Sequence, residues 1–239
     1  MSSLLIKNGR IIDPANRRDE VGDLLIVDGR IASDAEAKNN KAKPETIDAT
    51  GLVVTPGLID LHVHLREPGQ SAKETIATGT KCAAAGGFTT VVCMPNTAPS
   101  VDNASVVTWI LEKAKAEACV NVFPTGALTK GIAGEELAPI GAMYKAGVVA
   151  LTDDGHCIQN HEIMRRACEY ARMFGLTVMD HCQEYNLVGK GVMHEGRVST
   201  ELGLPGWAAV GEEIIVARNA LLADLTGTPI HCQHLSAAG

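Results

Sequence analysis

The pattern that most constrains the fold is a regular alternation of apolar runs and helix-like stretches that begins at residue 55. The apolar runs lie at residues 57–62, 89–94, 120–124, 148–152, 176–180 and 229–233. Between them, stretches rich in Ala, Glu, Lys and Met lie at residues 73–85, 104–118, 136–146, 161–174 and 212–223. Strands that alternate with helices indicate an α/β fold with a parallel sheet. A closed barrel of this kind has eight βα units. By this interpretation residues 55–239 contain about six βα units, so we expect an incomplete barrel.

The first 54 residues follow a different pattern and are predicted to form a separate β module. Asn8-Gly9 and Asp28-Gly29 each lie between apolar runs, which is a strong signal for a two-residue hairpin turn. Residues 47–54 are predicted as a further strand, and the polar residues 36–45 as a loop. We therefore expect two parts, an N-terminal β module over residues 1–54 and a βα domain over residues 55–239.

One long segment of the second part has no clear period. Residues 183–211 contain several glycines and lie between the fifth strand and the last helix. Loops of this length inside a compact domain are usually functional or mobile. We predict an irregular loop here.

Composition excludes several classes of partner. The net charge is −7, whereas a nucleic-acid surface needs a basic patch. No apolar run is long enough for a transmembrane helix, and the N-terminus reads as a strand and not as a signal peptide. The seven cysteines are odd in number and form no C-x-x-C pair. These features favour a reducing, cytoplasmic compartment with no nucleic-acid or membrane partner.

The strongest chemical signal is Asp60-Leu61-His62-Val63-His64, at the end of the first predicted strand of the βα domain. Side chains alternate along a strand, so His62 and His64 point to the same side. Ligands bind at the carboxyl ends of strands in parallel α/β folds. A single histidine there would favour an ordinary hydrogen-bonded residue, but the H-x-H spacing favours a metal site.

Further candidate ligands lie at the ends of later strands. His181 ends the fifth strand, and the sixth offers His231 and His234. His234 is nearer the carboxyl end and is preferred, which leaves His231 as a packing or supporting residue. Asp153-Asp154 ends the fourth strand, where a carboxylate could bridge two ions, although Asp-Asp-Gly is also a common turn. Strand alternation does not choose between the two aspartates.

Such a site predicts amide chemistry. Two cations would lower the pKa of a shared water and polarise an amide carbonyl, and zinc suits imidazole and carboxylate ligands. Arg66 follows His64 by two residues and could hold a substrate carboxylate through two parallel hydrogen bonds. The alternative is a surface arginine paired with an acid such as Glu67. Asn96, after the second strand, offers a donor and an acceptor, or simply caps a turn.

Five motifs in order give the chain a resemblance to a known family. The run Asp-Leu-His-Val-His-Leu-Arg-Glu-Pro-Gly at residues 60–69 closely resembles a signature of the dihydroorotases, which belong to the metal-binding amidohydrolases. Residues 86–97 resemble that family's second signature, and the resemblance continues through residues 152–155, 179–182 and 233–236. It implies a TIM-like (β/α)8 barrel of the metal-dependent hydrolases, with residues 1–54 as part of a composite β-sandwich.

The resemblance also implies roles for individual residues. His62 and His64 would bind one zinc ion, His181 and His234 a second, and Asp154 would bridge them. Arg66 and Asn96 would hold the substrate carboxylate. The implied reaction converts (S)-dihydroorotate and water reversibly to N-carbamoyl-L-aspartate in de novo pyrimidine (UMP) synthesis. A homo-oligomer and an association with aspartate transcarbamoylase are also implied.

The family's catalytic aspartate lies on the eighth strand, which would fall beyond Gly239. No general acid or base is therefore assigned within these residues, and the sequence reads as a C-terminally truncated member. We expect residues 1–239 alone to be inactive or poorly folded, because an open barrel exposes strand edges and apolar faces.

Two other functions compete with this reading. Hydantoinases and allantoinases usually carry a lysine at the end of the fourth strand and tend to lack the arginine. Here that strand ends in Thr152-Asp153-Asp154, and Lys145 lies too early. A non-catalytic dihydroorotase-like scaffold subunit of aspartate transcarbamoylase would typically have lost its metal histidines, which this chain keeps.

Overall fold

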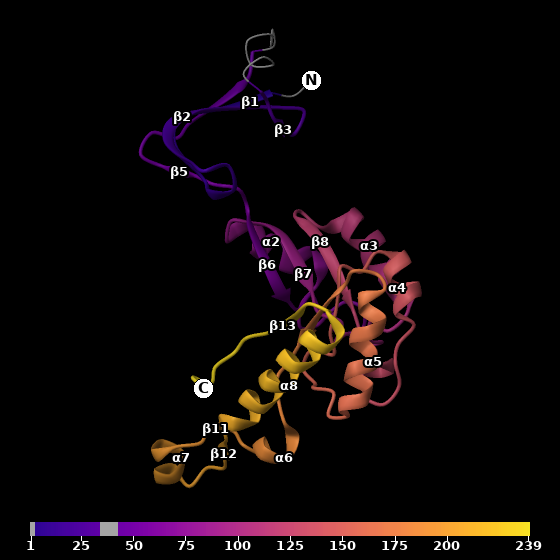
Figure 1. The fold of residues 1–239 in the computed structure, drawn as a ribbon. Helices are drawn as coiled ribbons and strands as arrows, with labels where there is room; N and C mark the ends of the chain where they lie inside the picture. Colours follow the sequence, from indigo (N-terminus) through magenta and orange to yellow (C-terminus); the bar gives the residue numbers. More distant parts are fainter. Residues whose placement is uncertain (1–2, 34–42) are drawn as a thin grey trace. The chain divides into compact units, whose positions relative to one another are not determined.

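The computed structural model describes residues 3–33 and 43–239, which belong to two compact units, Met1–Gly57 and Leu58–Gly239. The described part of the first unit is a five-stranded sheet in the order β3-β2-β1-β4, in which β5 also pairs with β1 (Figure 1). Its strands are β1 (Ser3–Asp13), β2 (Arg18–Val27), β3 (Arg30–Ile31), β4 (Glu45–Asp48) and β5 (Val53–Val54). The strand predicted over residues 47–54 is thus divided in two. Of the loop predicted over residues 36–45, residues 36–42 lie outside the described residues.

One of the two predicted hairpin turns is confirmed. Val27 pairs with Arg30, so Asp28 and Gly29 are the only residues of the turn between β2 and β3. Their φ angles are 48° and 78°. A two-residue turn with two positive φ angles has the type I′ form that matches the twist of a hairpin.

The hairpin turn predicted at Asn8-Gly9 is wrong. Asn8 lies inside β1 with φ 60°, where the pairing with β2 shifts register between Ile6 and Gly9. The main-chain nitrogen of Asn8 donates to the Asp23 carboxylate at 3.0 Å. Asn-Gly tolerates positive φ, and the chain uses that tolerance here for a β-bulge and not for a reversal. The reversal comes later, at the 3-10 turn η1 (Pro14–Asn16).

The second unit contains the six-stranded parallel sheet that the alternation predicted. Its order is β13-β10-β9-β8-β7-β6, so each strand lies beside its predecessor along the chain. The strands are β6 (Leu58–Val63), β7 (Phe88–Cys93), β8 (Asn121–Gly126), β9 (Ala150–Leu151), β10 (Thr177–Asp180) and β13 (Ile230–Cys232). The sheet curls, and it forms an incomplete (β/α) barrel.

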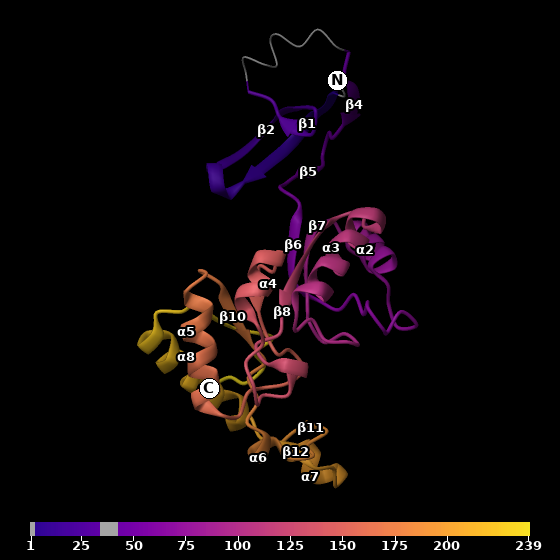
Figure 2. The ribbon, with the colours of Figure 1, turned by 90° about the vertical axis from the view of Figure 1, so that its right-hand side faces the viewer.

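Helices cover the outer face of this curl (Figure 2). They are α2 (Ile76–Ala85), α3 (Ala104–Glu117), α4 (Ile140–Ala146), α5 (His161–Arg172) and α8 (Val210–Thr226). Asn103 and Asn160 cap the first turns of α3 and α5, which explains where those helices begin. The main core lies between sheet and helices and includes Val91, Val107, Ile110, Met143, Leu151, Met164 and Val178.

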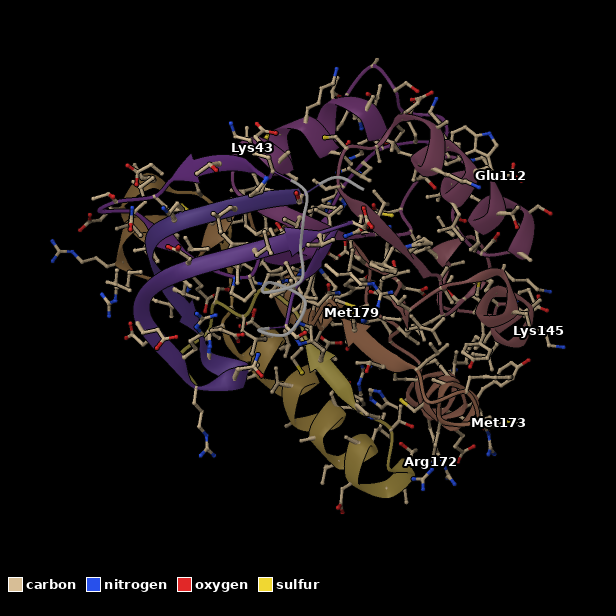
Figure 3. The ribbon with its side chains drawn as sticks, turned by 90° about the horizontal axis from the view of Figure 1, so that it is seen from above. Lys43, Glu112, Lys145, Arg172, Met173 and Met179 are labelled. Atoms are coloured by element: carbon tan, nitrogen blue, oxygen red, sulfur yellow. The ribbon has the colours of Figure 1, made fainter. Side chains whose placement is uncertain are left out.

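The inner face of the curl carries a second, smaller apolar cluster. It consists of Val92, Met94, Ala150 and Met179, and Met179 is labelled in Figure 3. Val91 and Val92 therefore belong to different cores, as expected for neighbours on a strand buried on both faces. This inner cluster lies on the strands whose carboxyl ends carry the predicted site.

The irregular loop predicted over residues 183–211 is wrong in detail. The segment contains α6 (Tyr185–Val188), β11 (Met193–His194), α7 (Arg197–Leu202) and β12 (Gly206–Trp207), and β11 pairs with β12 in a small parallel sheet (Figure 1). These elements have two to six residues each. Such short elements leave no periodic signal in a sequence.

Among the described residues, no helix is long and apolar enough to cross a bilayer.

Candidate metal centre

Five predicted ligands meet at the carboxyl ends of the strands. His62 lies near the end of β6 and His64 just beyond it, while Asp154, His181 and His234 follow β9, β10 and β13. The strands β6 and β13 are the two edges of the sheet. Even so, the rings of His62 and His234 have centroids only 5.3 Å apart. The curl of the sheet therefore brings its opposite edges to one place.

The Asp154 carboxylate lies at the middle of the cluster. Its Oδ1 is 3.4 Å from His62 Nε2, 3.8 Å from His181 Nδ1 and 3.6 Å from His234 Nε2, and its Oδ2 is 3.6 Å from His64 Nε2. Burial acts to raise the pKa of Asp154, but the hydrogen bond and charge of His62, with the charges of His64 and His181, hold that pKa below its usual value. The carboxylate is thus kept ionised.

The geometry fits two metal-binding triads that share this carboxylate. The donor atoms of each triad lie within 4.8 Å of one another, and the triads are His62, His64 and Asp154, and Asp154, His181 and His234. The paired nitrogens are 3.2 Å apart in the first triad and 3.0 Å apart in the second. Zinc–nitrogen bonds of about 2.0–2.1 Å at a tetrahedral angle place two ligand nitrogens about 3.3 Å apart. The donor set and its spacing therefore suit zinc.

Asn96 orients both His64 and Asp154. Its Oδ1 lies 3.0 Å from His64 Nδ1, and its Nδ2 donates to Asp154 Oδ2 at 3.2 Å. An amide oxygen only accepts, so the ring proton of His64 sits on Nδ1 and leaves a lone pair on Nε2. Burial lowers the pKa of His64, which keeps the ring neutral as a metal ligand must be. Asn96 thus contacts the cluster itself.

Asp153 has a separate role. Its side chain is buried, and its Oδ1 accepts hydrogen bonds from the main-chain nitrogens of Leu128 at 2.8 Å and Thr129 at 3.1 Å. The Thr129 hydroxyl donates to the other oxygen. Burial raises the pKa of Asp153 to about 6. Asp154, and not Asp153, is therefore the aspartate that lies among the histidines.

We expect Asp153→Ala to lower the free energy of unfolding by about 2–4 kcal/mol, because each buried amide that loses its acceptor costs about 1–3 kcal/mol. Urea unfolding followed by circular dichroism measures this. Asp153→Asn is the control, since its amide oxygen can replace Oδ1, and its effect should stay within about 1 kcal/mol. Equal losses in the two variants would show that the hydrogen bonds from Leu128 and Thr129 do not matter.

Arg66 lies beside the cluster and acts electrostatically on His64. It is half-buried, has φ 59°, and its charge helps to lower the pKa of His64, after the larger effect of burial. Within residues 3–33 and 43–239, its side chain has no hydrogen-bond or ion-pair partner. The expected alternative, a pair with Glu67, is wrong. Glu67 is buried and instead accepts from the Ile76 nitrogen at 2.8 Å and pairs with Lys113 at 3.5 Å.

A cavity of about 380 Å³ opens beside His181 and His234. Its other walls come largely from the segment that follows β10, and include Val192, Met193, His194 and Trp207. The space for a small molecule therefore adjoins the second triad.

His231 lies on β13 with an exposed side chain and is not part of the cluster, so the packing role expected for it is wrong.

Sequence reasoning missed two glutamines at the site. Gln183 Oε1 lies 2.8 Å from His181 Nε2. Gln233 is almost fully buried, donates to Thr152 Oγ1 at 3.1 Å, and is one of the groups that raise the pKa of His62, after Asp154. Both Gln183 and His181 lie past the end of β10 at Asp180, so strand alternation could not have paired them.

Comparisons with known proteins identify similar chains. A family model described as dihydro-orotase-like matches residues 51–238. The dihydroorotase of Geotalea daltonii is 54% identical over 239 residues, which cover 99% of this chain and 56% of that protein. The dihydroorotase of Solibacter usitatus is 53% identical over 233 residues, which cover 98% of this chain and 54% of that protein. The chain thus spans about half the length of these relatives.

Solved structures show the same architecture. The L-hydantoinase (dihydropyrimidinase) from Arthrobacter aurescens superposes with a TM-score of 0.76 at 21% identity, over 97% of this chain and 52% of that one. The D-hydantoinase (dihydropyrimidinase) from Thermus sp. superposes with a TM-score of 0.63 at 28% identity, over 96% of this chain and 51% of that one. At 21% identity, the first likeness concerns the fold alone.

Proposed function

Because the chain belongs to the dihydro-orotase-like family, we propose that it carries the metal-binding and substrate-binding residues of a dihydroorotase. The proposed reaction is the reversible conversion of (S)-dihydroorotate and water to N-carbamoyl-L-aspartate, in de novo pyrimidine synthesis. One observation carries the proposal above all others. Four imidazoles from three strand ends converge on the single carboxylate of Asp154.

The proposed cofactor is zinc, as one ion or two. The first ion would take His62 and His64, the second His181 and His234, and Asp154 would contact both. When bound there, zinc supplies Lewis-acid activation of water and of the amide carbonyl. The chain's own part is to hold neutral imidazole nitrogens and an ionised carboxylate at fixed positions, which the hydrogen bonds to Asn96 support.

Arg66 and Asn96 are the proposed substrate-binding residues. Dihydroorotate and N-carbamoyl-aspartate both carry a carboxylate, and a guanidinium can hold a carboxylate through two parallel hydrogen bonds. Arg66 is free to do so within the described chain and lies near His64. Asn96 is already engaged on both sides, its oxygen with His64 and its nitrogen with the Asp154 side chain and main chain. It would therefore bind the substrate by exchanging one of its hydrogen bonds to Asp154.

We expect Arg66→Met to weaken dihydroorotate binding about 10–100-fold, because a hydrogen bond to a charged group contributes about 1.5–3 kcal/mol. Isothermal titration of the zinc-loaded protein measures the change. Hydantoin is the control ligand, since it lacks the carboxylate and should bind the variant and the parent equally. An unchanged affinity for dihydroorotate would remove Arg66 from the substrate site.

The main alternative is a hydantoinase or allantoinase, because hydantoinases share this fold. Two observations favour dihydroorotate. An aspartate and not a lysine lies at the centre of the cluster, and Lys145 is exposed at the periphery on α4 (Figure 3). Arg66, whose side chain has no partner among the residues that the structure describes, supplies a site for a carboxylate. Binding should therefore be compared for dihydroorotate, allantoin and hydantoin. A preference for either of the last two would overturn the proposal.

A non-catalytic scaffold subunit is the second alternative. Retention of all five proposed ligands in one cluster favours a working metal site. Elemental analysis of the purified protein separates the two functions, and we expect zinc at one or two equivalents. A protein that takes up no zinc would support the scaffold.

The proposal includes partners and compartment. We propose a homo-oligomer that associates with aspartate transcarbamoylase, which follows from the family and is tested by light scattering with and without that enzyme. A reducing, cytoplasmic compartment is supported by the seven free cysteines.

A further inference from the structure

The two ring nitrogens of His181 face different groups. Nδ1 points into the cluster, 3.0 Å from His234 Nε2 and 3.8 Å from Asp154 Oδ1. Nε2 points away from it and lies 2.8 Å from Gln183 Oε1. The ring of His181 therefore links the proposed second triad to Gln183, which is not one of the proposed ligands.

These contacts decide where the ring proton sits. A neutral imidazole has one N–H and one lone pair, and an amide oxygen can only accept. The contact with Gln183 thus requires the proton of His181 on Nε2. The lone pair then lies on Nδ1, which faces Asp154 and His234. A proton on Nδ1 would point into the cluster and exclude a metal ion.

His64 is set in the opposite form by the same device. There Asn96 Oδ1 lies 3.0 Å from Nδ1, so the lone pair is on Nε2. Both acceptors are neutral amides. A metal-binding histidine usually gives its other N–H to a carboxylate, a main-chain carbonyl or a water. Side-chain amides provide the same orientation without a further negative charge beside the ion.

The main chain at Gln183 is held firmly in place. Its carbonyl oxygen accepts from Gln159 Nε2 at 2.9 Å, and Gln159 Oε1 accepts from the Tyr185 nitrogen at 2.9 Å. The neighbouring acid, Glu184, is engaged elsewhere, because its carboxylate caps α6 through the Leu187 nitrogen at 2.7 Å. Gln183 is thus the side chain at this turn that reaches the ring of His181.

We propose that Gln183 is a positioning residue that fixes His181 as its Nε2–H tautomer, so that Nδ1 binds metal together with Asp154 and His234. This inference rests on the metal centre proposed above. Removal of an outer hydrogen-bond partner of a metal histidine typically costs 10–100-fold in metal affinity. The loss should fall on the triad that contains His181 and spare the triad of His62 and His64.

The test compares three variants by zinc competition with a chromophoric chelator. Gln183→Met should bind one of two zinc ions at least about 10-fold more weakly than the parent. Gln183→Glu keeps an acceptor oxygen and should restore parental affinity or exceed it. Gln70→Met is the matched control, because Gln70 is also half-buried and contacts the Asn96 main chain but no histidine in the described chain. It should leave both affinities unchanged.

A second measurement needs no metal. Nitrogen-15 spectra of histidine-labelled, metal-free protein report the tautomer of each ring, and His181 should be protonated on Nε2 and His64 on Nδ1. An Nδ1–H form of His181 would overturn the inference. Equal zinc affinities of Gln183→Met and the parent would also overturn it. Equal losses of zinc affinity in Gln183→Met and Gln183→Glu would overturn it too, because they would mark a packing role for Gln183. A parent that binds no zinc would instead overturn the metal centre itself, and this inference with it.

Discussion

Asp154→Asn is expected to abolish tight zinc binding at both triads. The carboxylate is common to the two donor sets, and four imidazole nitrogens lie within 3.8 Å of its oxygens. An amide keeps the shape but removes the negative charge and replaces one acceptor oxygen with a donor nitrogen. Removal of a hydrogen-bond partner of a metal ligand typically lowers metal affinity 10–100-fold. Loss of the shared ligand itself should therefore lower zinc affinity by more than about 100-fold. Chelator competition measures both affinities.

Asp153→Asn is the matched control, because it makes the same chemical change one residue away. Asp153 binds the main chain at Leu128 and Thr129 and touches no histidine in the described chain. Zinc affinity should therefore stay within about 3-fold of the parent, a change of about 0.6 kcal/mol. If Asp153→Asn lost zinc and Asp154→Asn kept it, the two aspartates would have to exchange roles.

Arg218→Met is expected to destabilise the second unit by about 3–5 kcal/mol, because it leaves a buried carboxylate without its ion partner. Arg218 on α8 lies 2.8 Å from Asp180 Oδ2, and the two side chains are only 8% and 3% exposed. Asn219 also donates to Asp180 Oδ2, at 2.6 Å, but an amide does not neutralise the charge. Chemical denaturation followed by circular dichroism gives the change in free energy of unfolding.

The control for this variant is Arg166→Met. Arg166 pairs with Glu162 and Glu169 on the surface of α5, where its side chain is 53% exposed. Exposed ion pairs contribute about 0–1 kcal/mol, so this variant should unfold almost like the parent. Similar small losses in both variants would mean that the Asp180 side chain does not need the Arg218 guanidinium.

The βα domain could be predicted because its signal is repeated along the chain. Each strand is a short apolar run, and α3 and α5 begin directly after Asn103 and Asn160, which cap their first turns. The β module was harder, because Asn-Gly indicates only that the chain tolerates positive φ at Asn8. Whether that tolerance serves a turn or a bulge depends on pairing with a distant strand, here through Asp23.

The site was predictable only as far as strand alternation holds. It placed His62 and His64 together, since both lie on β6 or directly after it. It failed between Asp153 and Asp154, because β9 ends at Leu151 and both aspartates lie past the regular strand. The contact between Gln183 and His181 depends on how the turn after β10 is held by Gln159, which local sequence does not encode.

The strand order gives the metal centre a mechanical role as well as a chemical one. The donors on β6 and after β13 come from the two free margins of one sheet, and Asp154 stands between them. One proposed ion would take the β6 donors and the other the donor after β13, and both would share Asp154. The pair of ions would therefore link the two margins non-covalently through that carboxylate, and loss of Asp154 would release the link. Amide exchange in β6 and β13 should therefore slow together when zinc is added, even though no hydrogen bond joins the two strands.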